Sequence, residues 1–86
     1  DGSAWQTLAK VWRSQGQEMR ALRAEAEAQV AHYDYAAAVD RFKAAQDLAR
    51  KAGAKADYFE ASIIDTRLRA VEELLREQLS DKSINK

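Results

Sequence analysis

The sequence predicts an all-α domain of four antiparallel helices. Proline is absent and glycine occurs only three times in 86 residues, so few positions interrupt a helix. Alanine, leucine, glutamate, arginine and glutamine dominate the composition, and all of them favour helix. The signals that end one helix lie only a few residues before those that start the next. Connections that short return each helix antiparallel to the one before.

The first two helices are separated by a glycine. The first is expected over about Ser3–Ser14, with Asp1 or Ser3 as its N-cap. Gly16 follows directly and can take the left-handed conformation that ends a helix. The second helix is expected over about Gln17–Ala31.

The third helix begins after Asp34, which is a good N-cap residue. It is expected to continue to about Ala52, where Gly53 supplies the stop signal.

The fourth helix follows Asp57. Glu60 lies three residues later, so the pair resembles a capping box with aspartate in place of serine or threonine. The helix is expected to end near Leu79, which leaves 80–86 as a polar, disordered tail and 1–79 as a single domain.

The apolar positions of the second helix form two stripes. One consists of Met19, Leu22, Ala26 and Val30, and the other of Ala21, Ala24, Ala28 and Ala31. Two stripes require two neighbours, so this helix is predicted to lie between the first and the third.

The later helices have distinct faces. The third has a small-large-small face of Tyr35, Ala38, Phe42, Ala45 and Ala49, which lets a neighbour approach closely around one aromatic ring. The fourth has one main apolar stripe, of Ala61, Ile64, Leu68, Val71 and Leu75. Its other side is a solvated face of Asp65, Arg67, Arg69, Glu72, Glu73 and Arg76. A linear stack in sequence order is therefore predicted.

Two stretches resemble tetratricopeptide repeats, helix-turn-helix units of about 34 residues. The first match consists of Trp5, Leu8, Ala9, Trp12, Gly16 and Ala21, and the second of Asp34, Tyr35, Ala38, Phe42 and Ala45. The matches are out of phase, because one makes the middle helix the second of a repeat and the other makes it the first. The resemblance implies a helix-hairpin stack that holds other proteins.

Tyr33 departs from the repeat pattern, which has glycine before the Asp-Tyr pair. A bulky residue held at positive φ costs on the order of 1 kcal/mol or more. The turn is therefore expected to take another shape.

A longer resemblance covers Trp5–Gln78. The order of ALRAEAEAQVAHYDYAAAVDRFKAAQDLAR, a short loop and DYFEASIIDTRLRAVEELLREQ is similar to the C-terminal helical tail of BepA-like, HExxH-type bacterial zinc metalloproteases. The run from Ser62 to Leu68 is the most specific part. The resemblance implies a periplasmic protease in outer-membrane protein quality control, with this tail as its docking arm. The chain starts at Asp1, so we expect it to be a piece of a longer protein.

Candidate binding residues gather on the first two helices. In repeats of this kind the first helix lines a groove, and the candidate groove residues are Gln6, Lys10, Arg13, Arg20 and Arg23. Their basic groups can clamp a carboxylate of a protein or peptide partner. The alternative is a plain solvated helix face. Trp5 and Trp12 share one face, as core residues or as an exposed anchor for a partner.

The sequence does not support catalysis, metal binding, nucleic-acid binding or a membrane span. The chain has one histidine and no HExxH, so no catalytic, metal or cofactor site is expected here and zinc belongs to the absent catalytic domain. His32 is interpreted as a helix-end or surface residue. Fourteen basic residues balance fourteen acidic ones and no stacking platform is present, which argues against nucleic acid. No apolar run is long enough to span a bilayer.

The predicted function is protein–protein interaction, as the non-catalytic C-terminal arm of a periplasmic protease. The arm would recruit substrate or an outer-membrane assembly partner, or pack against its own protease domain. Two alternatives remain open: a purely structural cap that binds nothing, and a stand-alone cytoplasmic adaptor.

Overall fold

The computed structural model describes residues 1–55 and 57–84, and within them it confirms the predicted all-α class. The helices are α1 (Gly2–Ser14), α2 (Glu18–Ala31), α3 (Tyr35–Ala52) and α4 (Tyr58–Ile84), with a short 3-10 helix, η1 (Gly53–Lys55), after α3. The described residues contain no strand.

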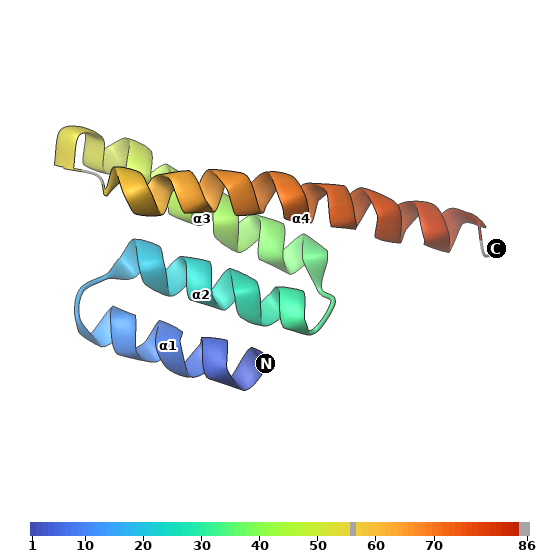
Figure 1. Ribbon diagram of the computed structural model, residues 1–86, viewed down its shortest axis with the longest axis horizontal. Helices are drawn as coiled ribbons and strands as arrows, with labels where there is room; N and C mark the ends of the chain where they lie inside the picture. Colours follow the sequence, from blue (N-terminus) through green and yellow to red (C-terminus); the bar gives the residue numbers. More distant parts are fainter. Residues whose placement is uncertain (56, 85–86) are drawn as a thin grey trace.

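The helices stack in sequence order (Figure 1). The chain reverses direction at each connection, and α2 lies between α1 and α3 as predicted. α2 also contacts α4, whereas among the helices α1 contacts only α2. The principal extents of 47 × 27 × 15 Å describe a flat, elongated stack.

Three aspartates cap three of the helices. The Asp1 carboxylate accepts a hydrogen bond from the Ala4 amide at 3.0 Å. Asp34 and Asp57 do the same for the third amide beyond them, each at 3.1 Å. Each bond satisfies an amide that has no partner within its helix, which explains why helices begin at these positions. Glu60 does not complete a capping box, because its carboxylate binds arginines of α2.

Residues with positive φ follow α1, α2 and α3, and the one after α2 is not a glycine. Gly16 has φ 75°, as predicted, while Gly53 ends α3 as predicted with φ 57° and ψ −125°, outside the left-handed helical region. Tyr33 has φ 62°, so the expectation that its turn would take another shape is wrong. Its side chain is 71% exposed and its ring meets that of Tyr35 edge to face at 6.4 Å between centroids.

Hydrogen bonds around the turn explain why Tyr33 keeps a conformation that favours glycine. Its amide donates to the Val30 carbonyl at 2.9 Å, and the Asp34 amide donates to the Gln29 carbonyl at 2.9 Å. This pair of bonds is the Schellman motif, which requires a left-handed residue at this position. The Gln78 side chain of α4 also donates to the Tyr33 carbonyl at 2.9 Å.

The hydrophobic core belongs to α2, α3 and α4. Its buried residues are Leu22, Ala26, Ala38, Val39, Phe42, Ala45, Ile64, Leu68 and Val71. The Phe42 side chain is fully buried, as the small-large-small stripe predicted, and Tyr35 packs partly buried against this core.

α1 lies outside this core. Only Gly2 and Ala9 of α1 are buried, against a helix whose alanines 21, 24 and 28 are buried as well. Trp5 and Trp12 are half-buried, so neither ring is fully enclosed. Leu8 is 39% and Val11 44% exposed. The α1–α2 junction, meaning the contact between these two helices, is thus made mainly by small residues.

α4 is longer than the sequence indicated. It runs to Ile84 rather than ending near Leu79, so residues 80–84 are helical and not a disordered tail. No glycine or proline follows Leu79 to stop the helix. Residues 85 and 86, also assigned to the tail, lie outside the described residues.

Candidate functional site

The structure does not gather the five candidate groove residues on one open surface. Arg13 joins α1 to α2: its Nη1 donates to Glu25 Oε2 at 2.8 Å and its Nε to Glu18 Oε2 at 3.0 Å. These hydrogen bonds raise the pKa of Arg13 and lower the pKa of Glu18 below its ordinary value. Arg13 therefore fastens the α1–α2 junction instead of standing free for a partner's carboxylate.

Arg20 and Arg23 join α2 to α4. Arg20 Nη2 donates to Asp57 Oδ2 at 2.9 Å and its Nε to Glu60 Oε1 at 3.3 Å, while Arg23 Nε donates to Glu60 Oε2. The Arg23 guanidinium also lies over the ring of Trp12, 5.7 Å from its centroid. The carboxylate of Glu60 is buried, at 3% exposure, and needs these partners. These two arginines therefore already have carboxylate partners within the chain, and their role in a partner-binding groove stays a prediction.

A fourth ion pair completes what we call the α2–α4 ladder, which consists of Arg20, Arg23, Glu27, Asp57, Glu60 and Arg67. Arg67 Nε donates to Glu27 Oε2 at 2.7 Å and its Nη2 to Glu27 Oε1 at 2.8 Å. Glu27 is 8% exposed, and its hydrogen bonds raise the pKa of Arg67. Arg67 is therefore not on the solvated face to which its sequence position assigned it.

Spacing could have pointed to this ladder. Arg20, Arg23 and Glu27 recur at helical intervals and form a third face of α2, beside its two apolar stripes. The three arginines and three carboxylates of the ladder balance, so it offers no net charge to a partner.

Gln6 and Lys10 are exposed like Arg13, but neither forms an ion pair within the described residues. Gln6 lines a shallow hollow of about 230 Å³ together with Glu25, Ala28, Gln29 and Arg41. On this side of the stack the solvated-face interpretation therefore describes the candidates better.

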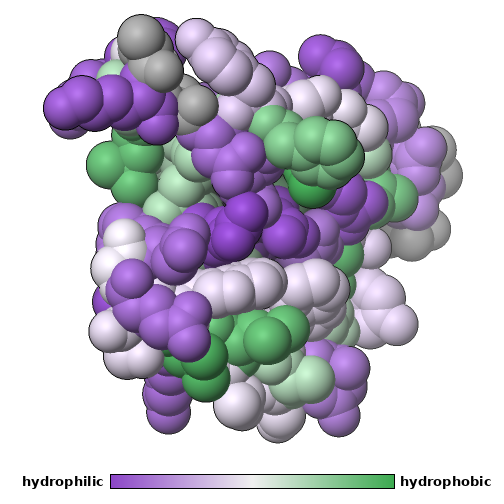
Figure 2. Space-filling view, turned by 60° about the vertical axis from the view of Figure 1, so that its left-hand side comes forward, coloured by the Kyte–Doolittle hydropathy of each residue, from purple (hydrophilic) through white to green (hydrophobic). Residues whose placement is uncertain are grey.

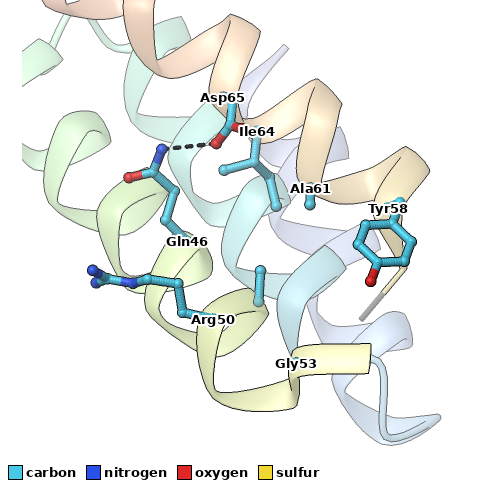
Figure 3. A pocket seen from close by; sticks show the side chains of 8 residues that line it. Gln46, Arg50, Gly53, Tyr58, Ala61, Ile64 and Asp65 are labelled. Atoms are coloured by element: carbon cyan, nitrogen blue, oxygen red, sulfur yellow. Dashed lines mark hydrogen bonds between the residues drawn. The ribbon is translucent and has the colours of Figure 1, made fainter. Parts of the chain in front are cut away.

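A larger cleft lies between the C-terminal half of α3 and the N-terminal half of α4, and sequence reasoning did not predict it (Figure 3). Its volume is about 440 Å³, and we call it the α3–α4 cleft. Its lining residues are Gln46, Ala49, Arg50, Gly53, Tyr58, Ala61, Ile64 and Asp65.

The α3–α4 cleft has an apolar floor and a polar rim. Ala49, Ala61 and Ile64 provide apolar carbon, since two alanines leave space where larger side chains would fill it. At one side the Gln46 amide donates to Asp65 Oδ1 at 2.8 Å (Figure 3). Tyr58 stands at another side with 71% of its surface exposed.

Two further findings concern metal binding and membrane spanning. No group of three or more His, Cys, Asp or Glu side chains lies close enough to hold a metal ion within residues 1–55 and 57–84. None of the described helices is long and apolar enough to cross a membrane. His32 ends α2, and its Nε2 lies 2.6 Å from the position a Cβ would take on Gly2, which shows that the ring covers the start of α1.

Comparisons with protein-family models, with curated proteins and with solved structures found no match.

Proposed function

We propose that this chain is a non-catalytic protein-interaction domain that binds a peptide or helix of a partner protein in the α3–α4 cleft. The observation that carries the proposal is the cleft itself, with about 440 Å³ of space over an apolar floor. Its size lies in the range of binding sites for compact ligands, and its rim offers an amide, a carboxylate and a phenol for orientation.

The ion pairs support this choice of surface over the basic residues of α1 and α2. Arg13, Arg20 and Arg23 already bind carboxylates of the same chain. An acidic partner would have to displace those carboxylates, which costs about as much as it gains. Tyr58, in contrast, is an uncharged side chain with 71% of its surface exposed, so a partner can contact it without displacing a carboxylate. Tyrosine is also among the residues that contribute most binding energy at interfaces.

The resemblance to BepA-like tails also suggests a parent protein and a partner. We propose that the domain is the C-terminal arm of a periplasmic zinc-dependent protease, and that its partner is an outer-membrane assembly protein or its own protease domain. The contact between α2 and α4 supports the tetratricopeptide-like arrangement, because corresponding helices of successive hairpins lie on one side of such a stack. It favours the phase in which α2 opens a repeat.

The binding proposal is tested with Tyr58→Ala, which removes one wall of the cleft. The immobilised chain is exposed to a bacterial envelope extract, and retained proteins are purified and titrated against wild type and variants. We expect Tyr58→Ala to weaken binding about tenfold or more. A tenfold loss corresponds to about 1.4 kcal/mol of binding free energy, which is typical for the loss of an aromatic contact at an interface. Lys10→Glu, on the far side of the stack, is the control and should bind like wild type. A purified partner that binds Tyr58→Ala as tightly as wild type overturns the proposal.

The structural-cap alternative has one observation in its favour. α4 carries the exposed charges Arg69, Glu73 and Arg76, as the terminal element of a stack should. If the chain is only a cap, no purified envelope protein will bind it in the titration above, while shortening α4 will lower its stability.

The proposal that this domain belongs to a protease is tested by reading the gene that encodes it. We expect the coding sequence upstream of Asp1 to contain a signal peptide followed by an HExxH motif. An upstream sequence with neither would remove the protease proposal and leave the stand-alone adaptor.

A further inference from the structure

The α3–α4 cleft is short and is bounded at both ends. Its lining runs along α4 from Tyr58 to Asp65 and along α3 from Gln46 to Gly53, so each wall is about two helical turns, or about 10 Å, long. At one end the Gln46 amide donates to Asp65 Oδ1 at 2.8 Å and joins the two helices (Figure 3). The other end lies at Gly53 and Tyr58, where the chain passes from α3 through η1 toward α4. The cleft is therefore a compact pocket and not a groove that runs along the stack.

These dimensions admit one bulky side chain and not a whole helix. A partner helix laid along the cleft would meet the bridge between Gln46 and Asp65 after about two turns, so its backbone has to stay above the rim. A cavity of about 150 Å³ holds a benzene ring. The cleft, with about 440 Å³, therefore has room for a larger ring system. On the face that Figure 2 shows, a band of hydrophilic residues divides the apolar surface into separate patches, which also favours recognition through one anchoring side chain.

The floor and one wall of the cleft suit a flat aromatic ring. Ala49 and Ala61 end at Cβ and are partly exposed, so together they present a low apolar surface on which a planar side chain can lie. The Tyr58 ring stands beside this surface in Figure 3. A second ring placed there is attracted to it edge to face, in addition to the apolar area that both bury. An aromatic side chain is therefore favoured over a branched aliphatic one.

The charged groups at the rim select a hydrogen-bond donor. Asp65 makes no ion pair within the described residues, and a carboxylate can accept several hydrogen bonds besides the one from Gln46. Arg50, the cation of the lining, extends away from α4 in Figure 3 and is bound to Asp47 of its own helix. An incoming group therefore meets an acceptor. It gains most if it donates a hydrogen bond without bringing a charge that must leave water over the apolar floor.

We propose that the α3–α4 cleft receives a tryptophan side chain of the partner protein, with the indole ring on the apolar floor beside Tyr58 and its N–H donating to Asp65. The inference rests on the proposed binding function of this cleft and names the group that binds there. Tryptophan has the largest aromatic side chain, and its indole nitrogen is a donor only. Phenylalanine has no donor, and tyrosine has a single ring that fills less of the space.

The tryptophans of this chain itself are poor candidates for the role. Trp5 and Trp12 are half-buried in α1, which packs on α2, and the guanidinium of Arg23 lies over the Trp12 ring. A second copy would have to detach its α1 from α2 before either ring could reach the cleft. The tryptophan is therefore expected from a different protein.

An NMR titration of the nitrogen-15-labelled chain with N-acetyltryptophanamide tests the pairing. We expect the backbone amides of Ala49, Ala61 and Ile64 to shift with a Kd of about 1 mM, because a probe of this size lacks the rest of the interface. N-acetyl-1-methyltryptophanamide keeps the ring but has no indole N–H. It should bind about tenfold more weakly, because the hydrogen bond to a charged acceptor is lost.

Asp65→Ala separates the hydrogen bond from the ring contact. Asp65 is exposed, so the variant is expected to fold, and it should bind both probes with the same affinity. Asp81→Ala is the matched control, an equal change at another exposed carboxylate of α4, and should keep the difference between the probes. Equal affinities of the two probes for wild type overturn the proposal. A difference that persists in Asp65→Ala overturns it as well, and so does the absence of shifts at about 10 mM probe.

The outcome for the partner protein is distinguishable from the outcome for the probes. If Tyr58→Ala weakens binding of the purified partner while the probes fail, the cleft binds its partner through another group, and only the tryptophan inference is wrong. A partner that binds Tyr58→Ala like wild type contradicts the binding function of the cleft, and this inference with it.

Discussion

The α1–α2 junction and the α2–α3–α4 core use different means to hold helices together. The core encloses Phe42, Ile64 and Val71 completely, so its stability comes from large apolar side chains removed from water. The junction buries Gly2 and Ala9 and leaves Leu8 and Val11 partly exposed, while the exposed Arg13 bridges the two helices. Close approach of small residues thus positions α1, but it buries little apolar area.

The comparison implies that α1 is the least stable helix of the stack. Its hydrogen bonds are those of any helix, but it has one helical neighbour where α2 and α3 each have two or more. Elements with few buried contacts open at lower free energy than the global unfolding transition. α1 should therefore detach before the core unfolds.

The largest expected effect comes from the centre of the core. Phe42→Ala should lower the free energy of unfolding by about 3–5 kcal/mol, because it removes a fully buried ring and leaves a cavity between alanines. Urea unfolding followed by far-UV circular dichroism measures the loss. Leu8→Ala, at 39% exposure in the junction, is the control and should cost less than about 1 kcal/mol. Similar losses at the two sites would show that the junction and the core do not differ.

The next largest loss of stability is expected from removing a buried ion pair. Glu60→Gln should cost about 1–3 kcal/mol, because Glu60 is 3% exposed and its charge compensates the half-buried Arg23. Arg13→Gln in the junction should cost no more than about 1 kcal/mol, since its partners are partly in water and screened. The same urea titrations apply. A loss for Arg13→Gln that exceeds the loss for Glu60→Gln would assign the electrostatic stability to the junction.

The two turns should respond alike, although only one contains glycine. Gly16→Ala should cost about 1 kcal/mol from backbone strain alone, since a Cβ at Gly16 meets no atom within 4 Å. At the other turn, Tyr33→Gly should be more stable than Tyr33→Ala by about 1 kcal/mol. Both Tyr33 variants lose the ring contact with Tyr35, so their difference isolates the cost of φ 62°. Equal stability of these two variants would mean that Tyr33 is not strained.

The smallest effect is a pH dependence in the acid range. The pKa of Glu18 is lowered by its hydrogen bonds from Arg13, and the pKa of Asp57 is lowered first by the hydrogen bond from the Glu60 amide. A lowered pKa in the folded state means that stability is fully present above the ordinary values of 4.5 and 3.8 and is lost as the pH falls through the folded values. Unfolding free energies at neutral and acid pH measure the loss. Glu18→Gln and Asp57→Asn should each flatten the profile, and a profile unchanged by both contradicts this assignment.

Much of the fold was predictable because local chemistry decides it. Asp34 and Asp57 cap helices that begin where their side chains accept backbone hydrogen bonds, and Gly16 ends one by adopting positive φ. The burial of Phe42 followed from the alanines on either side of it at helical spacing. These features depend on residues within one or two turns of each other.

The candidate site was harder to predict because it depends on which helices face each other. Arg23 and Glu60 are 37 residues apart, and only the contact between α2 and α4 makes them partners. A basic residue on a helix looks the same in sequence whether it is free or paired across the stack. The α3–α4 cleft is left open by two small residues, Ala49 and Ala61. In a sequence, an alanine on a helix face is as consistent with close packing as with open space. Tyr33 was misjudged because the Schellman hydrogen bonds and Gln78 stabilise a conformation that its side chain disfavours.

Both tryptophans of the chain lie on α1, and that position makes them local probes. Trp12 sits beneath the guanidinium of Arg23, so its emission should change when α1 leaves α2. Circular dichroism, in contrast, averages over every helix. If α1 detaches first, the fluorescence transition in urea will precede the dichroism transition, and the chain will fail the usual test of two-state unfolding without any label being added.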